Sequence, residues 1–146
     1  MSVFADSSAL VKLYVPEAGH QVVRQATEPF VVSHLARVEV PAALWRKSRS
    51  GELAADDAHL LATAFAFDLS GDDDSEARYV VVGVDDGVLS DAVRLLPLHG
   101  LRAYDAVQLA SALAAQTADK QCDTIAAFDT DLRRAAAAEG LALLPP

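Results

Sequence analysis

Short apolar runs alternate with helical segments along nearly the whole of this 146-residue chain, and this alternation limits the possible folds more than any other feature. The runs that have the length and continuous apolar character of buried strands are residues 3–5, 30–33, 79–84, 123–128 and 141–144. Strands that alternate with helices form a parallel sheet, and right-handed crossovers place the carboxyl ends of its strands at one edge. The sequence therefore predicts a single α/β domain over residues 1–146, a three-layer sandwich in which a short parallel β-sheet is flanked by helices.

Asp6 lies where the first predicted strand ends and the first predicted helix begins. In an open parallel sheet, ligands bind in the crevice outside this edge. An aspartate in this place is also a common helix cap, and the hydroxyls of Ser7 and Ser8 can cap the helix instead. Asp6 is therefore a candidate both for a helix cap and for a ligand-binding residue.

Three further acids occupy comparable places in the predicted fold. Glu39 lies in the helix after the second strand, Asp105 lies near the start of the helix that leads into the fourth strand, and Asp129 follows that strand. Asp131 stands close behind. A cluster of carboxylates repels itself and stays ionised only when a cation neutralises it. Each acid alone is more often a cap or a surface charge, so the hypothesis of a shared site depends on their convergence.

Such a cluster is typical of a magnesium or manganese site. Carboxylate oxygens are hard ligands, which Mg2+ and Mn2+ prefer. A metal ion held in this way can polarise a phosphodiester oxygen and activate water for attack. The sequence has no His-x-x-x-His or Cys-x-x-Cys pattern, so a zinc site is not expected.

The composition limits the cellular compartments and the kinds of binding partner that are expected for this chain. The formal net charge of −9 argues against loose, charge-driven binding of nucleic acid, so an RNA substrate needs a local basic patch or a metal bridge. The apolar stretches are far shorter than the about 20 residues of a membrane span, and no signal-peptide pattern opens the chain. The single cysteine, Cys122, cannot form an internal disulfide, which suits a reducing compartment. We therefore expect a cytoplasmic protein with no membrane segment.

The helix after the second strand contains an anomaly. Its apolar stripe is expected to comprise Leu35, Val38, Ala42 and Trp45. Pro41 falls inside this segment, where proline removes a backbone hydrogen bond and strains the preceding turn. We expect a kink at Pro41 or a helix that starts later than the end of the strand.

Four segments of the chain resemble the four signature blocks of PIN domains, and more narrowly those of the VapC toxins of bacterial toxin–antitoxin pairs. The resemblance spans nearly the whole chain, and the first and third blocks together are the specific ones. The segments are Asp6–Lys12, Arg37–Val40, Tyr104–Ala110 and Phe128–Leu132.

The resemblance implies a Mg2+- or Mn2+-dependent endoribonuclease that forms a homodimer. It also implies inhibition by a cognate VapB antitoxin, which inserts a peptide near the active site. The family's acidic ligands match Asp6, Glu39, Asp105 and Asp129 in this sequence. Ser7 matches the hydroxyl position after the first aspartate, where it orients a ligand or a water molecule.

Two surfaces are expected for partners. A basic cluster can hold RNA phosphates or, equally well, complement a helix dipole; its members are Arg37, Arg46, Lys47 and Arg49. The groove expected for the antitoxin consists of Leu10, Leu13, Tyr14 and Trp45. Tyr14, Trp45 and Phe65 are also candidates for stacking on bases, although core packing or a dimer contact is the commoner role of such residues.

In one place the sequence departs from the family pattern. The fourth block usually carries Thr or Ser two residues before its aspartate, and Ala127 stands there. A hydroxyl that holds the fourth carboxylate is then missing. Asp131 is therefore an alternative to Asp129, although capping the last helix is its more ordinary role. The rival hypothesis is a catalytically weak PIN-like module that binds RNA or a protein without cutting.

Overall fold

Five parallel strands form one sheet in the computed structural model, which describes residues 1–146. Their order across the sheet is β3-β2-β1-β4-β5, and their bounds are β1 (Val3–Ala5), β2 (Phe30–Ser33), β3 (Val80–Val82), β4 (Thr124–Ala126) and β5 (Ala142–Leu144). All neighbouring strands are parallel, with Phe4 opposite Val31 on one side of β1 and opposite Ile125 on the other. The predicted short parallel sheet is confirmed.

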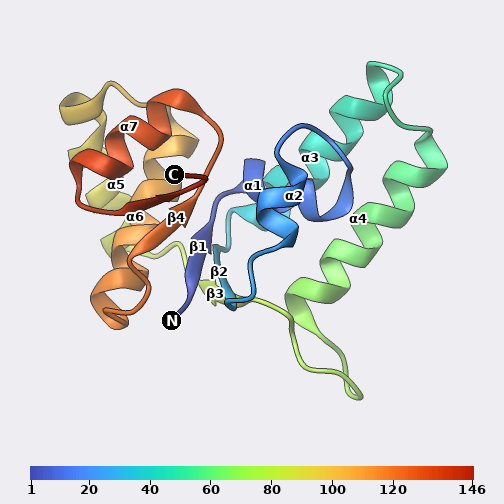
Figure 1. The fold of residues 1–146 in the computed structure, drawn as a ribbon, viewed down its shortest axis with the longest axis horizontal. Helices are drawn as coiled ribbons and strands as arrows, with labels where there is room; N and C mark the ends of the chain where they lie inside the picture. Colours follow the sequence, from blue (N-terminus) through green and yellow to red (C-terminus); the bar gives the residue numbers. More distant parts are fainter.

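Helices cover both faces of this sheet, which confirms the three-layer sandwich (Figure 1). One layer contains α5 (Asp86–His99), α6 (Ala103–Ala118) and α7 (Thr130–Ala138). The other contains α1 (Ser7–Tyr14), α2 (His20–Arg24), α3 (Ala36–Arg49) and α4 (Ala55–Ser70). None of these helices is both long enough and apolar enough to cross a membrane.

Each helical layer has its own apolar core against the sheet. Phe4 and Leu109 are buried in the core beneath α5, α6 and α7. Val3 and Leu44 are buried in the core beneath α1 to α4. Successive side chains of a strand point to opposite faces, so β1 contributes to both cores and lies at the centre of the molecule.

The strand order reverses beside β1. The chain passes from β1 to β2 on one side and later adds β4 on the other side of β1. A crevice opens outside the carboxyl ends of the strands at such a reversal, and ligands bind there. Asp6 directly follows β1, and Asp129 follows β4, so two of the predicted site residues flank this crevice.

Asp6 and Asp129 both cap helices. Asp6 Oδ1 accepts a hydrogen bond from the Ala9 N–H of α1 at 2.9 Å, and Asp129 Oδ1 accepts one from the Leu132 N–H of α7 at 2.9 Å. Ser7 and Ser8 do not cap α1, because Asp6 occupies the N-cap position and both serines lie inside the helix. Capping uses one carboxylate oxygen and leaves the second oxygen for another partner.

The buried face of α3 differs from the predicted stripe. Ala36, Val40 and Leu44 recur every four residues and are fully buried. The prediction that Val38 and Trp45 face the core was wrong, since these side chains are 68% and 38% exposed. The predicted stripe is shifted by about one residue from the observed one. On a helix, such a shift moves the predicted side chains from the buried face toward solvent.

The helix that contains Pro41 starts late, as one of the two expectations for it stated. The first helical residue of α3 is Ala36, three positions after the end of β2 at Ser33. Pro41 nevertheless lies inside α3 and cannot donate to the carbonyl four residues before it. The expected delay is confirmed, and it keeps Glu39 within the first turn of the helix.

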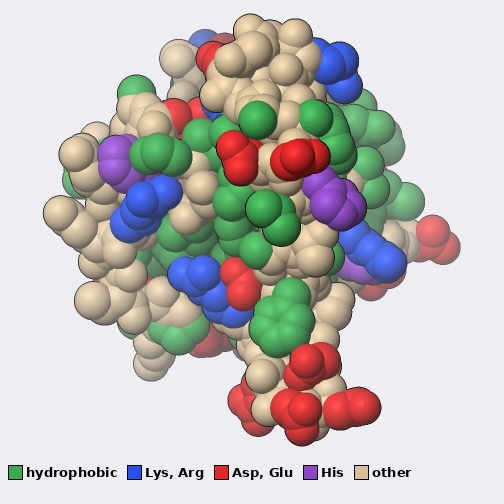
Figure 2. Space-filling view, turned by 90° about the vertical axis from the view of Figure 1, so that its right-hand side faces the viewer, with side chains coloured by type: hydrophobic (Ala, Val, Ile, Leu, Met, Phe, Trp, Pro, Cys, Tyr) green, Lys and Arg blue, Asp and Glu red, His purple; other side chains and the backbone are tan.

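Part of the acidic surplus lies on a projecting loop. Its carboxylates, all exposed, belong to Asp72, Asp73, Asp74 and Glu76. Acidic side chains cover the tip at the bottom of Figure 2, where the loop after α4 projects in Figure 1. The loop precedes β3 and therefore lies toward the amino ends of the strands. Its charge is thus separated from the carboxyl-end crevice.

Candidate functional site

One cavity of about 670 Å3 opens at the carboxyl ends of the strands, and the four predicted acids all line it. Asp6 comes from the end of β1, Glu39 from α3 and Asp105 from α6, whereas Asp129 precedes α7. Four segments that are far apart in the sequence therefore converge here. The convergence that the sequence analysis assumed is present in the fold.

Asp6 is the most buried of these acids, with 4% of its surface exposed. Its Oδ1 accepts hydrogen bonds from the Ala9 N–H and, at 2.7 Å, from the Ser8 hydroxyl, whereas Oδ2 has no hydrogen-bond partner. The pKa of Asp6 is raised to about 7, mainly by burial. The negative charges of Glu39 and Asp105 add to this rise, and the two hydrogen bonds oppose it. A group in this position gains most from a nearby cation.

Glu39 is fixed by two neighbouring side chains. Its Oε1 accepts a hydrogen bond from the Ser7 hydroxyl at 3.0 Å and from Gln108 Nε2 at 2.7 Å. Gln108 Nε2 also donates to the Ser7 oxygen at 3.0 Å, so the three side chains form a closed triangle. Ser7 thus orients a carboxylate, as the family resemblance implied for this position. The second oxygen, Glu39 Oε2, has no hydrogen-bond partner.

Gln108 is a site residue that the sequence analysis missed. It lines the cavity, is 2% exposed and has a buried Oε1 with no hydrogen-bond partner. A buried amide oxygen without a partner costs about 1–3 kcal/mol. The available clue was its spacing, because Gln108 stands three residues after Asp105 and therefore on the same face of α6.

Arg102 joins Asp105 to Asp129, and the sequence analysis missed it as well. Its guanidinium lies 3.2 Å from Asp105 Oδ2 and 3.5 Å from Asp129 Oδ2. Burial and the charge of Asp129 raise the pKa of Asp105, and Arg102 opposes that rise. The Arg102 side chain is itself 80% exposed. Ion pairs with an exposed arginine are weak. Asp105 and Asp129 therefore hold the Arg102 cation only loosely.

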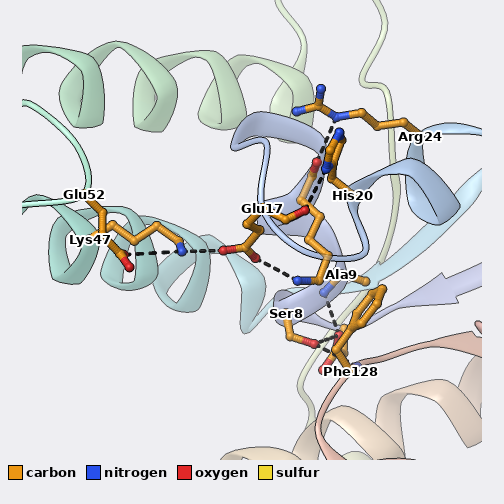
Figure 3. A network of polar contacts seen from close by, with 10 residues as sticks. Ser8, Ala9, Glu17, His20, Arg24, Lys47, Glu52 and Phe128 are labelled. Atoms are coloured by element: carbon orange, nitrogen blue, oxygen red, sulfur yellow. Dashed lines mark hydrogen bonds and ion pairs between the residues drawn. The ribbon is translucent and has the colours of Figure 1, made fainter. Parts of the chain in front are cut away.

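A second charged network forms the far wall of the cavity (Figure 3). Glu17 lies between two lysines, with Oε1 at 2.9 Å from Lys12 Nζ and Oε2 bonded to Lys47 Nζ. Although burial alone raises it, the pKa of Glu17 is lowered overall by these lysines. Lys12 is almost fully buried and lies 4.3 Å from the centre of the Phe128 ring. Lys47 also lies 3.7 Å from Glu52, so the wall carries ion pairs with little net charge.

Asp131 does not belong to the cavity. Its side chain is 62% exposed and pairs with Arg134 at 3.1 Å. The prediction that Asp131 caps the last helix was wrong, since Asp129 is the cap. Ala127 is fully buried in the core beneath α6 and α7 and is absent from the cavity wall. The missing hydroxyl at position 127 therefore leaves Asp129 in place, because capping positions that carboxylate.

The predicted basic and apolar surfaces are only partly present. Of the four basic candidates, Arg46 and Lys47 line the cavity, whereas Arg37 and Arg49 do not. Leu10 is fully buried, so its prediction as part of a surface groove was wrong.

The aromatic candidates for base stacking do not line the cavity. Phe65 is almost fully buried, and the Tyr14 hydroxyl is bonded to the Tyr79 hydroxyl at 2.7 Å. Trp45 is partly exposed but lies outside the cavity lining. The aromatic residue that does line the cavity is Tyr104.

In its chemistry, though not in its present spacing, the donor set suits a divalent metal ion. Asp6 Oδ2, Glu39 Oε2 and Asp105 Oδ1 are carboxylate oxygens with no hydrogen-bond partner on the wall of one cavity. Hard oxygen ligands of this kind suit Mg2+ and Mn2+. As the side chains stand, no group of three or more His, Cys, Asp or Glu side chains is arranged to hold a metal ion.

Comparisons with known proteins agree with this architecture. The family model of the PIN domain matches residues 3–138. The crystal structure of PAE2754 from Pyrobaculum aerophilum superposes with a TM-score of 0.64 at 19% sequence identity, over 99% of this chain and 85% of that one. A comparison with curated proteins finds no match. Since the family model covers most of its length, the chain belongs to the PIN domain family, whose members are typically metal-dependent nucleases.

Proposed function

We propose that this protein is an endoribonuclease that depends on Mg2+ or Mn2+ and acts as the toxin of a VapBC-type toxin–antitoxin pair. The observation that carries the proposal is the convergence of Asp6, Glu39, Asp105 and Asp129 on one cavity at the switch point of a parallel sheet. Asp6, Glu39 and Asp105 are each oriented through one oxygen, whereas both oxygens of Asp129 have partners. Orientation before binding reduces the cost of assembling a metal site.

The same four residues are the proposed metal ligands. A divalent ion bound there would polarise a phosphodiester oxygen of the RNA and activate a water molecule for attack. Ser7 and Gln108 hold Glu39 in a fixed orientation, and the capping hydrogen bonds hold Asp6 and Asp129. Arg102 contacts two of the acids as a guanidinium, which supports the proposal that a cation is favoured at this place.

The cavity wall also offers groups for RNA phosphates. Arg46, Lys47 and Arg102 line it, against six carboxylates from Asp and Glu. The cavity is therefore negative overall, and a phosphate can approach the acids only together with a metal ion. The acidic loop after α4 lies at the other end of the strands, so its charge adds little repulsion there.

A cleavage assay tests this function. Purified protein is incubated with labelled single-stranded RNA in the presence of Mn2+, Mg2+ or EDTA. We expect cleavage with either metal, none with EDTA and none in the Asp6→Asn variant. Asp85→Asn is the matched control, because Asp85 caps α5 through a 2.9 Å bond to the Val88 N–H but does not line this cavity. Metal-dependent binding of RNA without cleavage favours the rival hypothesis of a catalytically weak module.

The toxin role has separate tests. Its support is the resemblance of the four sequence blocks, together with the negative cavity, which suits insertion of a basic antitoxin peptide. We expect induced expression to stop growth of a host cell, Asp6→Asn to relieve the arrest, and coexpression of the cognate VapB-like protein to relieve it too. Growth arrest by Asp6→Asn as strong as by the natural protein contradicts a toxin that works by cleaving RNA.

The homodimer is part of the same proposal. Leu89 and Val93 stand four residues apart on α5 and are 44% and 65% exposed, so they form an apolar face with no partner inside the chain. We expect light scattering to give twice the chain mass and Val93→Glu to give the chain mass alone.

A further inference from the structure

Tyr104 is an exposed aromatic side chain on the wall of the acidic cavity. It is 63% exposed, and neither a hydrogen bond nor an aromatic contact holds it. The hydroxyls of the other two tyrosines, Tyr14 and Tyr79, are hydrogen-bonded to each other. A large side chain that the fold leaves free at the mouth of a cavity is available to a ligand.

The neighbours of Tyr104 leave room for such a ligand. Ala103 and Ala43 line the same cavity and have small side chains. Arg102 directly precedes α6 and Asp105 lies in its first turn, so the start of this helix presents a cation, an aromatic ring and a site carboxylate to the cavity. A nucleotide whose phosphate lies near the acids can therefore place its base toward the ring.

The charge of the cavity favours a neutral, flat group beside Tyr104. Six carboxylates and three cationic side chains line the wall, which disfavours a second anion near the ring. A nucleobase is neutral, and stacking on an aromatic side chain contributes about 1–3 kcal/mol per base. Every base has such a face, so this contact tolerates different sequences.

The size of the cavity suits a single nucleotide. Its volume of about 670 Å3 lies within the range of about 300–1,000 Å3 for sites that bury one drug-sized molecule. A base that lies against Tyr104 cannot be paired at the same time. We infer that Tyr104 forms a subsite for one unpaired nucleobase of the RNA; this inference rests on the ribonuclease function proposed above.

A double-mutant cycle between protein and RNA tests the subsite. The substrates are a short single-stranded RNA with a mapped cut site and a series in which one nucleotide near the cut is abasic. The variants are Tyr104→Ala and Tyr104→Phe, with Phe67→Ala as a control because Phe67 is 46% exposed on α4 outside the cavity. KM and kcat are measured for each pair, and direct binding is followed by fluorescence anisotropy.

We expect Tyr104→Ala to raise KM by about 5- to 150-fold, the range for loss of one base stack, with little change in kcat. Tyr104→Phe and Phe67→Ala should match the natural protein. One abasic position should raise KM of the natural protein to a similar extent and leave Tyr104→Ala unchanged.

Other outcomes overturn the subsite. An unchanged KM in Tyr104→Ala, or an equal effect on every abasic RNA, means that the ring does not contact a base. A fall in kcat or in Mn2+ affinity means that the ring supports the acids instead, and a loss confined to capture of a protein partner means that it serves an interface. If the natural protein binds single strands through Tyr104 but cuts none, the ribonuclease proposal fails and the subsite stands.

Discussion

The two oxygens of the best-held site carboxylates have different environments. Asp6 Oδ1 caps a helix and Glu39 Oε1 accepts from Ser7 and Gln108, whereas Asp6 Oδ2 and Glu39 Oε2 have no hydrogen-bond partner. The protein thus fixes the direction of each carboxylate without using its full capacity to bind a cation. This division explains how Asp6 is both a cap and a candidate ligand.

The Gln108→Leu variant tests whether Gln108 serves to orient the site or to stabilise the core. The substitution removes the donor to Glu39 and the buried oxygen that lacks a partner. Since that oxygen costs about 1–3 kcal/mol, we expect a melting temperature at or above that of the natural protein. Loss of a group that orients a metal ligand weakens metal binding by about 10- to 100-fold, which titration calorimetry with Mn2+ measures.

The control for this variant is Gln116→Leu, in the same helix but outside the cavity lining. It should leave Mn2+ affinity unchanged. Early melting of Gln108→Leu together with normal Mn2+ affinity would show that Gln108 serves the core.

Asp6→Asn should stabilise the protein above neutral pH when no metal is present. Folding raises the pKa of Asp6 from its ordinary value of 3.8 to about 7. At any pH between these two values, the folded chain therefore binds more protons than the unfolded chain. Stability contributed by protonated Asp6 is present in acid and is lost as the pH rises through about 7. Asparagine caps helices as well as aspartate does, so the cap survives the substitution.

Thermal melts in EDTA over a pH series measure the effect. The pKa of Asp6 rises from 3.8 to about 7, which is about three units. One unit corresponds to about 1.4 kcal/mol, so we expect the variant to gain up to about 4 kcal/mol at alkaline pH and nothing in acid. Asp85→Asn, an exposed cap elsewhere, should show no such gain. If the melting temperatures of Asp6→Asn and the natural protein differ by the same amount at every pH, the prediction is wrong.

At the scale of elements, the sequence predicted the strands and the acids at their ends better than the helix faces. Strands are short and apolar on both sides, so a run such as Val3–Ala5 is recognisable in isolation. The buried face of α3 could not be read in this way, because a shift of one residue turns the stripe that carries Val38 toward solvent.

Gln108 and Arg102 were missed for a related reason. Their importance depends on which distant side chains they meet, and the pairs Gln108–Glu39 and Arg102–Asp129 are 69 and 27 residues apart in the sequence. Spacing along one helix placed both near Asp105, but only the tertiary fold supplies the other partners. The acids themselves were predictable because each follows a strand or begins a helix.

Glu17 connects the elements on the far wall of the cavity. It lies between α1 and α2 and bonds to Lys12 of α1 and Lys47 of α3. Glu17→Gln leaves the buried Lys12 ammonium without its counterion, and breaking a buried ion pair costs about 3 kcal/mol or more. We expect melting to fall by about 6–12 °C at neutral pH, at about 2–4 °C per kcal/mol.

The pH dependence of this effect has a definite sign. Because the pKa of Glu17 is lowered on folding, its stabilisation is present above its ordinary pKa and disappears as the pH falls through the lowered value. The two melting curves should therefore converge in acid. Glu52→Gln is the control, since Glu52 is 63% exposed and only 3.7 Å from Lys47, and an exposed pair contributes at most about 1 kcal/mol.

At the scale of the whole molecule, a chain with net charge −9 should bind RNA through few phosphates. Three cationic side chains line the cavity. For single strands the logarithm of the affinity falls by about 0.7 per phosphate contact for each tenfold rise in salt, so a fourfold rise should raise KM by about 20-fold at constant metal concentration. A change above about a thousandfold would indicate a wider basic surface, and no change would exclude phosphate contacts by these side chains.

Crystals grown with manganese chloride test most directly whether Asp6, Glu39, Asp105 and Asp129 share a divalent cation. Diffraction data collected near the manganese absorption edge locate the ion without reference to activity. We expect an anomalous peak inside the cavity, in contact with Asp6 and at least one of the other acids, with the Arg102 guanidinium withdrawn from Asp105. A protein that cleaves RNA with Mn2+ but shows manganese only on its outer surface, or none, contradicts the shared site.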